Sequence, residues 1–485
     1  MTDPLYLAID LGTSSVRAAL VDGHGRITAF ASRFYQQVIP RFGWAEQSAT
    51  AWWEGALGAI REVVAGADAT RIAAICACGQ MHGTVLIDAD GRLARDAVLL
   101  WNDKRAAGDV ADWSATHPFA DYSGITANPA TPAWPAFKLR WLRDNEPLDY
   151  ARTATVLAPK DFINFQLTGI RATDWTEASA SFLADYRTGS WSQPLIDALG
   201  LRHDFLPDIH DPGTVLGPIT AAVAQGTGLR EGTPVLAGGG DLPIALLGSG
   251  AFAAGAYSDI TGTSAIATSV RPTPLLSPLV SNVALPGGNW GAFTLVDAGG
   301  DAVRWTRRVL IDDGDPATAT PGSNGLFFLP FLSGQRLGQA QNARAQFFGL
   351  TASHGPAELK RAVLEGVTMA LKQQFDAIGA RPQQFITAGA AGRSELWLKI
   401  KAAIYGVPLL VPRELECGAI GCAILAATAT IGGTLSENAA RMAGIDHEVL
   451  PDPAWQERYA RMLPLFGHLR EAMAPLNDEL DALVR

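Results

Sequence analysis

Cysteine, long apolar runs and a leader-type start are scarce or missing in this sequence, and each absence excludes a class of protein. The chain has four cysteines among its 485 residues. Cys76 and Cys78 lie two apart in an apolar run, without further ligands at metal-binding spacing, so we expect buried thiols and no metal cluster. The longest apolar run, around 419–431, is too short to span a bilayer. The N-terminus lacks the basic and apolar regions of a signal peptide, so we expect a cytoplasmic protein without membrane association.

An excess of basic residues is also missing. The sequence contains 38 Lys and Arg against 48 Asp and Glu, a formal net charge of −10. Nucleic-acid-binding proteins usually present a basic surface, so this balance argues against a nucleic-acid partner. It leaves a phosphate ligand open, because backbone N–H groups and a metal ion can hold phosphate without a basic patch. The P-loop pattern GxxxxGK followed by Ser or Thr is absent, so any phosphate site must be of another kind.

The chain has enough apolar sequence for two cores. Hydrophobic residues make up 48% of it and charged residues 18%, an ordinary globular balance. Because single cores stop growing beyond roughly 250–300 residues, the length predicts two large lobes.

An internal duplication supports two lobes. The chain opens with predicted strands at 5–11, 16–21 and 27–34, a helix at 48–64 and a strand at 71–78. A second strand–turn–strand unit covers 255–270, and its turn is a near copy of the first. We therefore place a boundary at the Gly- and Ser-containing segment 248–250, with domains 1–248 and 249–485.

The two similar turns predict a phosphate site. Asp10 stands at a strand end, followed by Gly12, Thr13 and Ser14; Gly262 and Thr263 occupy the second turn. Exposed N–H groups and hydroxyls bind phosphate oxygens, and Asp10 is placed to hold Mg²⁺ directly or through water. One such turn alone is equally compatible with an ordinary hairpin, whereas two facing turns favour a nucleotide held from both sides.

Asp241 is the candidate general base. It follows Gly238, Gly239 and Gly240, which allow a close backbone approach after an apolar strand. Phosphorylation of an alcohol needs a base near the attacking hydroxyl, in line with the γ-phosphate. The alternative is a glycine-rich hinge whose Asp caps the next helix, and the residues alone leave both open.

Two further groups of residues are candidate ligand contacts. The first group offers hydrogen-bond donors, acceptors and apolar side chains that suit a sugar. The second is the small-residue loop 388–394, which suits an adenine or ribose. The sugar group comprises Met81, His82, Trp101, Asn102 and Asp103, and the nucleotide loop includes Gly389 and Ala390.

Taken together, these segments resemble the FGGY carbohydrate kinases along essentially the whole chain. The resemblance is carried by 9–15 (IDLGTSS), 80–83 (QMHG), 100–103 (LWND), 238–241 (GGGD), 261–264 (TGTS) and 361–366 (RAVLEG), with Pro159-Lys160-Asp161 and Thr173-Asp174 following the family's course. The sugar-site segments are most similar to those of the xylulokinases within this family.

The resemblance implies a two-domain actin-like ATPase (ribonuclease H-like) α/β fold with a duplicated mixed-sheet core and a cleft between the lobes. It implies an ATP- and Mg²⁺-dependent kinase that phosphorylates the terminal hydroxyl of a ketopentose, most similar to kinases acting on D-xylulose. Asp241 would be the base and Asp10 would position Mg²⁺-ATP. The implied partners are a sugar and ATP, with a homodimer left open.

This sequence departs from the family's usual residues at three places. Leu242 and Pro243 follow Asp241 where Asn or Gln is usual, and segments 335–339 and 390–391 also differ. A pocket that loses a hydrogen-bonding group can change its preferred substrate. The alternatives are therefore a kinase for ribulose, another pentulose or a polyol, and, in a different class, a non-catalytic sugar or nucleotide sensor. A chaperone-type ATPase is a third option, but it usually needs an added peptide-binding domain, and we expect no residues of this chain to be left over for one.

Overall fold

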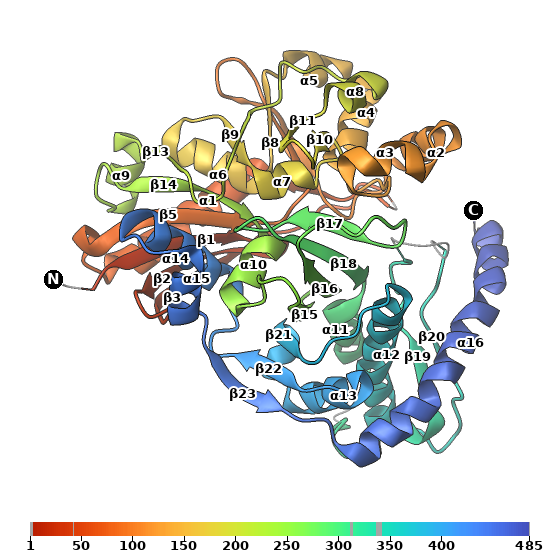
Figure 1. The fold of residues 1–485 in the computed structure, drawn as a ribbon. Helices are drawn as coiled ribbons and strands as arrows, with labels where there is room; N and C mark the ends of the chain where they lie inside the picture. Colours follow the sequence, from red (N-terminus) through yellow and green to blue (C-terminus); the bar gives the residue numbers. More distant parts are fainter. Residues whose placement is uncertain (1–2, 42, 311–313, 336–341, 485) are drawn as a thin grey trace.

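The computed structural model describes residues 3–41, 43–310, 314–335 and 342–484. Two large mixed sheets form its centre (Figure 1). The first has the order β13 (Val215–Pro218), β14 (Pro234–Gly240), β5 (Ile72–Gly79), β1 (Leu5–Leu11), β2 (Ser15–Asp22), β3 (Ile27–Phe34). The second has the order β17 (Ser281–Ala284), β18 (Trp290–Val296), β16 (Ala265–Arg271), β15 (Tyr257–Thr261), β21 (Phe385–Gly389), β22 (Leu409–Pro412), β23 (Ile445–Val449).

The two sheets repeat one pairing pattern. In the first, β1 pairs antiparallel with β2 and parallel with β5, and β5 pairs parallel with β14. In the second, β15 pairs antiparallel with β16 and parallel with β21, and β21 pairs parallel with β22. The predicted duplication of a mixed-sheet core is therefore confirmed. It brings the carboxyl ends of β1, β5 and β14 and of β15 and β21 to the middle of the molecule.

Helices cover both faces of the first sheet. One face packs against α1 (Ala49–Ala65), α6 (Pro159–Thr168) and α9 (Ala221–Thr227). The Ser48 hydroxyl caps α1 by accepting the N–H of Ala51 at 3.1 Å, as the predicted N-terminus requires. The other face packs against α10 (Asp241–Ser249), α14 (Cys417–Thr430) and α15 (Leu435–Met442). A segment from the second half of the chain thus completes the first lobe's core.

The predicted hinge at 248–250 is part of this packing. Gly248 lies inside α10, and a Cβ there would come within 1.9 Å of the Cys417 carbonyl oxygen. Gly421 of α14 is matched to it, since a Cβ there would lie 2.0 Å from the Ile244 carbonyl oxygen. Both glycines let the two helix backbones touch. Gly248 therefore belongs to a close helix crossing, and α10 ends at Gly250 with φ +84°.

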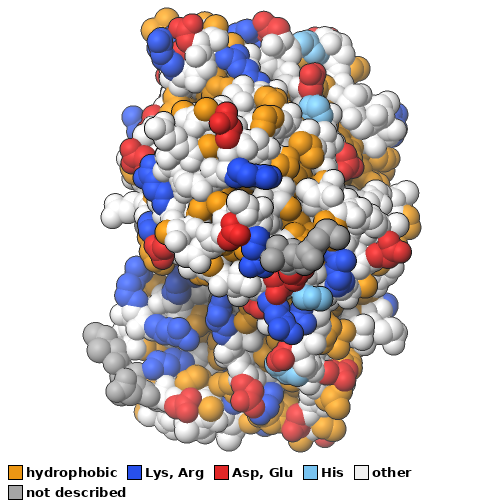
Figure 2. Space-filling model, turned by 90° about the vertical axis from the view of Figure 1, so that its left-hand side faces the viewer, with side chains coloured by type: hydrophobic (Ala, Val, Ile, Leu, Met, Phe, Trp, Pro, Cys, Tyr) orange, Lys and Arg blue, Asp and Glu red, His pale blue; other side chains and the backbone are white. Residues whose placement is uncertain are grey.

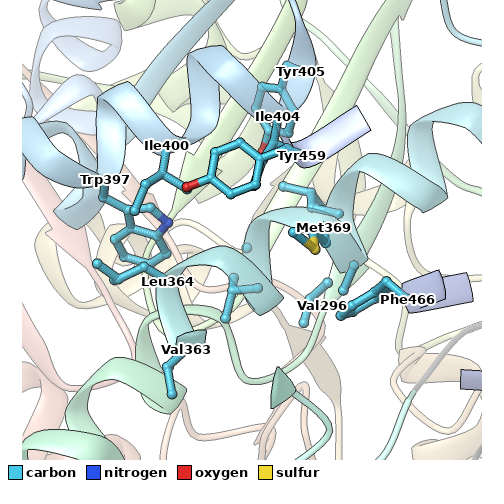
Figure 3. Packing of buried hydrophobic residues seen from close by; sticks show 14 of the residues in the cluster. Val296, Val363, Leu364, Met369, Trp397, Ile400, Ile404, Tyr405, Tyr459 and Phe466 are labelled. Carbon is cyan, nitrogen blue, oxygen red and sulfur yellow. The ribbon is translucent and has the colours of Figure 1, made fainter. Parts of the chain in front are cut away.

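The second lobe has its own core (Figure 3). It is built on α12 (Pro356–Ala377), α13 (Glu395–Tyr405) and the terminal α16 (Pro453–Val484), which runs along one edge of the molecule in Figure 1. In Figure 3 Tyr459 of α16 lies beside Ile400 and Ile404 of α13, and Phe466 of α16 lies near Val296. Because α16 supplies buried aromatic rings, the last segment is an integral part of this lobe.

The remaining elements surround the two sheets. A smaller sheet has the order β4 (Glu46–Ser48), β7 (Leu93–Leu99), β6 (Thr84–Ile87), β8 (Thr155–Leu157). Three two-stranded pairs are β10 (Ala184–Asp185) with β11 (Ser190–Trp191), β12 (Asp208–His210) with β9 (Ala172–Asp174), and β19 (Phe327–Leu329) with β20 (Gln346–Phe348). The other helices are α2 (Ala107–Thr116), α3 (Phe119–Thr126), α4 (Pro135–Asn145), α5 (Pro147–Arg152), α7 (Trp175–Ser179), α8 (Gln193–Ala198) and α11 (Gly299–Val309), with 3₁₀ turns at Ala69–Arg71, Ser323–Gly325 and Ala390–Arg393.

The surface carries both signs of charge. On the face shown in Figure 2, acidic side chains are interspersed with Lys and Arg, which gather in its lower part. All four cysteines are buried free thiols, as predicted. Among the helices that the structure describes, none is both long and apolar enough to cross a bilayer.

Candidate active site

The first predicted phosphate turn joins β1 to β2 and is held from outside. Within it, the N–H of Gly12 donates to the Ser15 carbonyl oxygen at 3.0 Å. Gln47 Nε2 donates to the Thr13 carbonyl oxygen at 2.6 Å, and Trp101 Nε1 donates to Thr13 Oγ1 at 3.1 Å. The Tyr35 hydroxyl donates to the Gly12 carbonyl oxygen. Because these contacts fix the turn's carbonyl groups, its conformation is set before any ligand binds.

The second turn, between β15 and β16, is held in the same way. The N–H of Gly262 donates to the Ser264 carbonyl oxygen at 2.9 Å. Arg304 Nη2 of α11 donates to Thr263 Oγ1 at 3.1 Å. Below the turn, buried Lys401 donates to Thr261 Oγ1 and to Asp259 Oδ1, at 2.7 Å and 2.9 Å. In both turns a glycine N–H donates to a following serine carbonyl oxygen and the threonine hydroxyl accepts a side-chain donor, although the first turn spans one residue more.

Both turns line one cavity of about 480 Å³ between the two sheets. Ligand sites in proteins typically have volumes of about 300–1,000 Å³. The predicted residues that line this cavity are Asp10, Gly12, Thr13, Ser14, Met81, His82, Trp101, Asp241, Gly262, Thr263 and Gly389. The fold therefore gathers residues from both halves of the chain into a single site.

Asp241 lies at the start of α10, directly after β14, and lines this cavity. Burial and the negative charge of Asp10 raise the pKa of its carboxyl to about 7. The N–H of Leu242 donates to Asp241 Oδ1 at 2.7 Å and partly opposes that rise. Because a general base works best when its pKa is near the operating pH, this carboxylate is suited to accept a proton from an alcohol.

Asp10 has a different electrostatic environment. Burial raises the pKa of its carboxyl, and Glu416 adds to the rise, while Arg17 opposes it. Arg17 Nη1 lies 3.1 Å from Asp10 Oδ2 and 3.4 Å from Glu416 Oε2, and Arg393 Nη2 lies 2.7 Å from Glu416 Oε1. All four side chains line the cavity. The site thus combines two carboxylates and two guanidinium groups around the first turn.

Two of these cavity residues, Arg17 and Glu416, were not among the sequence-predicted site residues, and Arg393 was included only as part of the loop 388–394. Arg17 carried a signal, because in a hairpin closed by the 12–14 turn it stands directly across from Asp10, as the β1–β2 register shows. Glu416 carried no such signal, since it precedes a helix from the distant end of the chain.

The predicted sugar group is only partly brought to the cavity. Met81 packs against the backbone before the candidate base, since a Cβ at Gly240 would lie 2.5 Å from Met81 Sδ. His82 has a positive φ of 68°, uncommon for a non-glycine residue, and its carbonyl oxygen accepts a hydrogen bond from buried Lys138 at 2.7 Å. His82 Nδ1 lies 3.2 Å from the Ala180 carbonyl oxygen. The ring is therefore held against the cavity wall by a strained backbone.

Asp103 and Asn102 do not line the cavity, contrary to their predicted role. Asp103 Oδ2 accepts the N–H of Ala45 at 2.6 Å and lies 2.8 Å from Arg105 Nη2, and its Oδ1 accepts the N–H of Arg105 at 2.9 Å. The carboxylate is fully buried and holds its own loop. Asn102 is half-buried beside it, with Oδ1 shielded from solvent.

The nucleotide loop follows β21. Gly389 has φ +79°, and a Cβ there would lie 2.5 Å from the Thr261 carbonyl oxygen, so only glycine lets this loop lie against the second turn. Ala390 begins the next 3₁₀ turn, and its side chain is outside the described part of the chain. Of the unusual segment 335–339, only residue 335 is described.

The residues present fit a metal–nucleotide ligand. Mg²⁺ is usually held by one or two carboxylates together with substrate phosphates, rather than by a protein cage. Among the described residues, no three His, Cys, Asp or Glu side chains are grouped as a metal cage. Asp10 beside two glycine-containing turns matches the one-carboxylate arrangement, and Gly389 lets the loop after β21 lie against the second turn at the cavity wall.

Sequence comparison places this geometry among known proteins. Residues 5–248 match the FGGY family of carbohydrate kinases, N-terminal domain, and residues 259–430 match the C-terminal domain. The chain is 31% identical to the xylulose kinase of Escherichia coli K12, covering 97% of this chain and all of that one. It is 29% identical to the autoinducer-2 kinase of Klebsiella pneumoniae, covering 94% and 92% of the two chains.

Structural comparison agrees with the sequence matches. The ligand-bound xylulose kinase from Lactobacillus acidophilus superposes with a TM-score of 0.91 at 26% identity, over 98% of this chain and all of that one. The predicted two-domain fold class is confirmed by this similarity.

Proposed function

The chain belongs to the FGGY family of carbohydrate kinases, and on that basis we propose that it phosphorylates the terminal hydroxyl of a ketopentose, with D-xylulose as the first substrate to test. The family makes it a sugar kinase and a phosphotransferase. One observation carries the finer proposal: a carboxylate with a pKa of about 7 lies in the same cavity as the two turns. We also propose that the domains are 1–248 and 249–485, with α14 returning to the first sheet.

In this mechanism Asp241 takes the proton of the attacking hydroxyl as its oxygen bonds to the γ-phosphorus, while the bond from that phosphorus to the β–γ bridging oxygen breaks and ADP leaves. The Thr13 and Thr263 turns hold the phosphate oxygens from opposite sides and keep the γ-phosphorus in line with that hydroxyl. Arg17 supplies positive charge beside the first turn. Met81, His82 and Trp101 shape the sugar side of the cavity and exclude water, which would otherwise compete for the phosphoryl group.

Asp10 would hold Mg²⁺, directly or through water. When bound, the ion would neutralise charge on the phosphate oxygens during transfer. The Asp10 carboxylate lies at the end of β1, across the hairpin from Arg17, so its position is fixed by the sheet.

The pH dependence of turnover tests the assignment of the base. A base must be unprotonated to act, so kcat/KM should fall about tenfold per pH unit below about pH 7, where the Asp241 carboxyl takes up its proton. The measurement is a steady-state profile from pH 5.5 to 9 with saturating Mg²⁺. Tryptophan fluorescence should stay constant over this range, to show that the fold is intact. A rate that is level from pH 5.5 to 7.5 would contradict the assignment.

The sugar preference is argued from the wall beside Asp241. Leu242, Phe293 and Leu295 line the cavity there and continue into the buried apolar cluster behind it. Ile260 and Ile266, paired across β15 and β16, extend the same wall. An apolar wall accepts a methyl or methylene group as well as a hydroxyl-bearing carbon. This feature favours tolerance of deoxy sugars, and it supports the alternative of another pentulose or a polyol.

Leu242→Asn should change this preference. We expect the ratio of kcat/KM for D-xylulose to that for 1-deoxy-D-xylulose to rise about tenfold, because the amide offers a hydrogen bond that only the hydroxylated sugar can use. Leu148→Asn, the same substitution at a position that is 81% exposed, is the matched control. An unchanged ratio in the Leu242 variant would remove this residue from the specificity argument.

The decisive experiment for the proposed function is ADP release and sugar-phosphate detection across a panel of pentuloses and polyols. Phosphorylation of a ketopentose is the expected result. The competing sensor hypothesis predicts ligand binding without product, and it would be supported if sugars and ATP bind but no sugar phosphate forms.

A further inference from the structure

A cluster of buried charges lies behind the strand end that carries Asp241. Lys160 of α6, Asp161, Asp174 and Glu177 of α7 are all at most 6% exposed. Lys160 Nζ lies 2.7 Å from Asp174 Oδ2, pairs with the Asp161 carboxylate, and donates to the Ala237 carbonyl oxygen at 2.8 Å. Lys160, Asp161 and Asp174 belong to segments that the sequence resemblance included without giving them any role. Burying four ionisable groups is costly, and such groups are often replaceable by apolar residues without loss of stability. A positional role would explain their presence.

The cluster supplies a hydrogen-bond donor to the backbone where the pairing of β14 is interrupted. Between Leu236 and Gly239 the register against β5 shifts, and Gly238 has φ +68°. A bulge of this kind re-aims the strand end and leaves backbone groups unpaired. The freed carbonyl oxygen of Ala237 accepts hydrogen bonds from Lys160 Nζ and from Asn164 Nδ2, both at 2.8 Å. Side chains of α6 thus hold the bulge that turns the chain toward the cavity.

Thr176 links the cluster to Gly240, the residue that precedes Asp241. Asp174 Oδ1 accepts the N–H of Thr176 at 2.7 Å and its hydroxyl at 2.5 Å. With its proton directed to Asp174, the Thr176 oxygen accepts the N–H of Gly240 at 2.8 Å. Thr176 also packs closely against Gly239, since a Cβ at Gly239 would lie 2.9 Å from Thr176 Oγ1. Lys160 fixes Asp174, Asp174 fixes Thr176, and Thr176 fixes Gly240, the residue directly before the base.

We infer that Thr176, oriented by Asp174 and Lys160, is a positioning residue that holds the Asp241 carboxylate in line for proton abstraction. The inference rests on the proposed function, because it takes Asp241 as the base. Thr176 does not line the cavity, so it acts only through the backbone. Misplacing a reacting group by about 1 Å can cost about 10²-fold in rate. A lost contact at Gly240 is therefore expected to change kcat far more than substrate binding.

The experiment uses Thr176→Val, which removes the hydroxyl at nearly constant shape, and Thr176→Ser, which keeps it. We expect the Val variant to lower kcat by about 10–10²-fold with both KM values within about threefold. The Ser variant should stay within about threefold of the wild type. Hydrogen–deuterium exchange of a peptide covering 238–246 should accelerate in the Val variant alone.

Thr368→Val is the matched control. Thr368 is fully buried in the second lobe, its hydroxyl donates to the Leu364 carbonyl oxygen at 2.8 Å, and it accepts Trp397 Nε1 at 3.0 Å. The substitution therefore also deletes a buried hydroxyl with one donated and one accepted bond. We expect it to lower Tm about as much as Thr176→Val while keeping kcat.

The outcomes separate this inference from the proposed function. If Thr176→Val keeps kcat, or if Thr176→Ser is no better than Val, the positioning role is wrong even where Asp241→Asn is inactive. If Asp241→Asn keeps its activity, the base is misassigned and the proposed function fails first. The exchange measurement needs no turnover: equal exchange at 238–246 in wild type and Val variant overturns the inference whatever the enzyme phosphorylates.

Discussion

Asp241→Asn is expected to lower kcat for sugar phosphorylation by at least about 10²–10⁴-fold, the usual contribution of a general base. The amide keeps the side chain's shape but cannot accept the hydroxyl proton. ATP and sugar affinities, measured by titration calorimetry, should remain within about threefold, because the substitution leaves the two turns and the side chains of Met81, His82 and Trp101 unchanged. The readouts are kcat from ADP release and the two dissociation constants. Near-full activity in this variant would show that another group takes the proton.

A stability measurement on the same variant checks that it folds. The folded-state pKa of Asp241 is raised above the ordinary value by burial. Its contribution to stability is therefore fully present below pH of about 4 and is lost as the pH rises through about 7, where the buried group must ionise. At pH 8 the neutral Asn avoids that cost, so the variant should have a higher Tm than the wild type. The difference should disappear toward pH 4–5. Asp112→Asn, on the exposed side of α2, is the control and should change neither rate nor Tm.

The core of the fold could be predicted because its signals are local. The strand at 27–34 and the N-cap at Ser48 are found as expected. The two turns have near-identical sequences, so the duplication could be predicted from the chain, although the first turn closes from Gly12 to Ser15 and the second from Gly262 to Ser264. The boundary at 248–250 stays a prediction, whereas the close crossing of α10 and α14 at Gly248 was not predicted, because it depends on residues far apart in sequence.

The candidate site was predictable where residue type and strand end coincide. Asp10 and Asp241 follow apolar strands, and parallel neighbouring strands bring such ends together. Asp103 shows the limit of that rule. It also follows a strand, but the Arg105 guanidinium two residues later donates hydrogen bonds to its carboxylate. No sequence periodicity indicates whether such a carboxylate pairs with a neighbouring residue or faces a ligand. Glu416 reaches the cavity only through tertiary packing, so no sequence pattern grouped it with Arg393 of the nucleotide loop or with Arg17.

Asp10→Asn is the second variant with a large expected effect. The carboxylate stands beside the first turn, and its loss removes both the proposed ligand of Mg²⁺ and the partner of Arg17, 3.1 Å away. Removing one preorganised charge-stabilising group typically costs about 10²–10³-fold in rate. We expect kcat/KM for ATP to fall by that factor and the Mg²⁺ concentration for half-maximal activity to rise. Sugar affinity should stay unchanged.

The two aspartates are distinguished by the signs of their neighbours. Burial raises the pKa of the Asp10 carboxyl, but the Arg17 guanidinium opposes that rise and favours the anionic form, which suits a cation ligand. Burial and the Asp10 charge act on Asp241 and favour proton uptake, which suits a base. The variants should therefore have opposite signatures: Asp10→Asn changes the Mg²⁺ dependence, whereas Asp241→Asn changes kcat with the Mg²⁺ dependence preserved. If Asp10→Asn left the Mg²⁺ requirement intact and Asp241→Asn raised it, the assigned roles would have to be exchanged, because the cation would then lie beside α10.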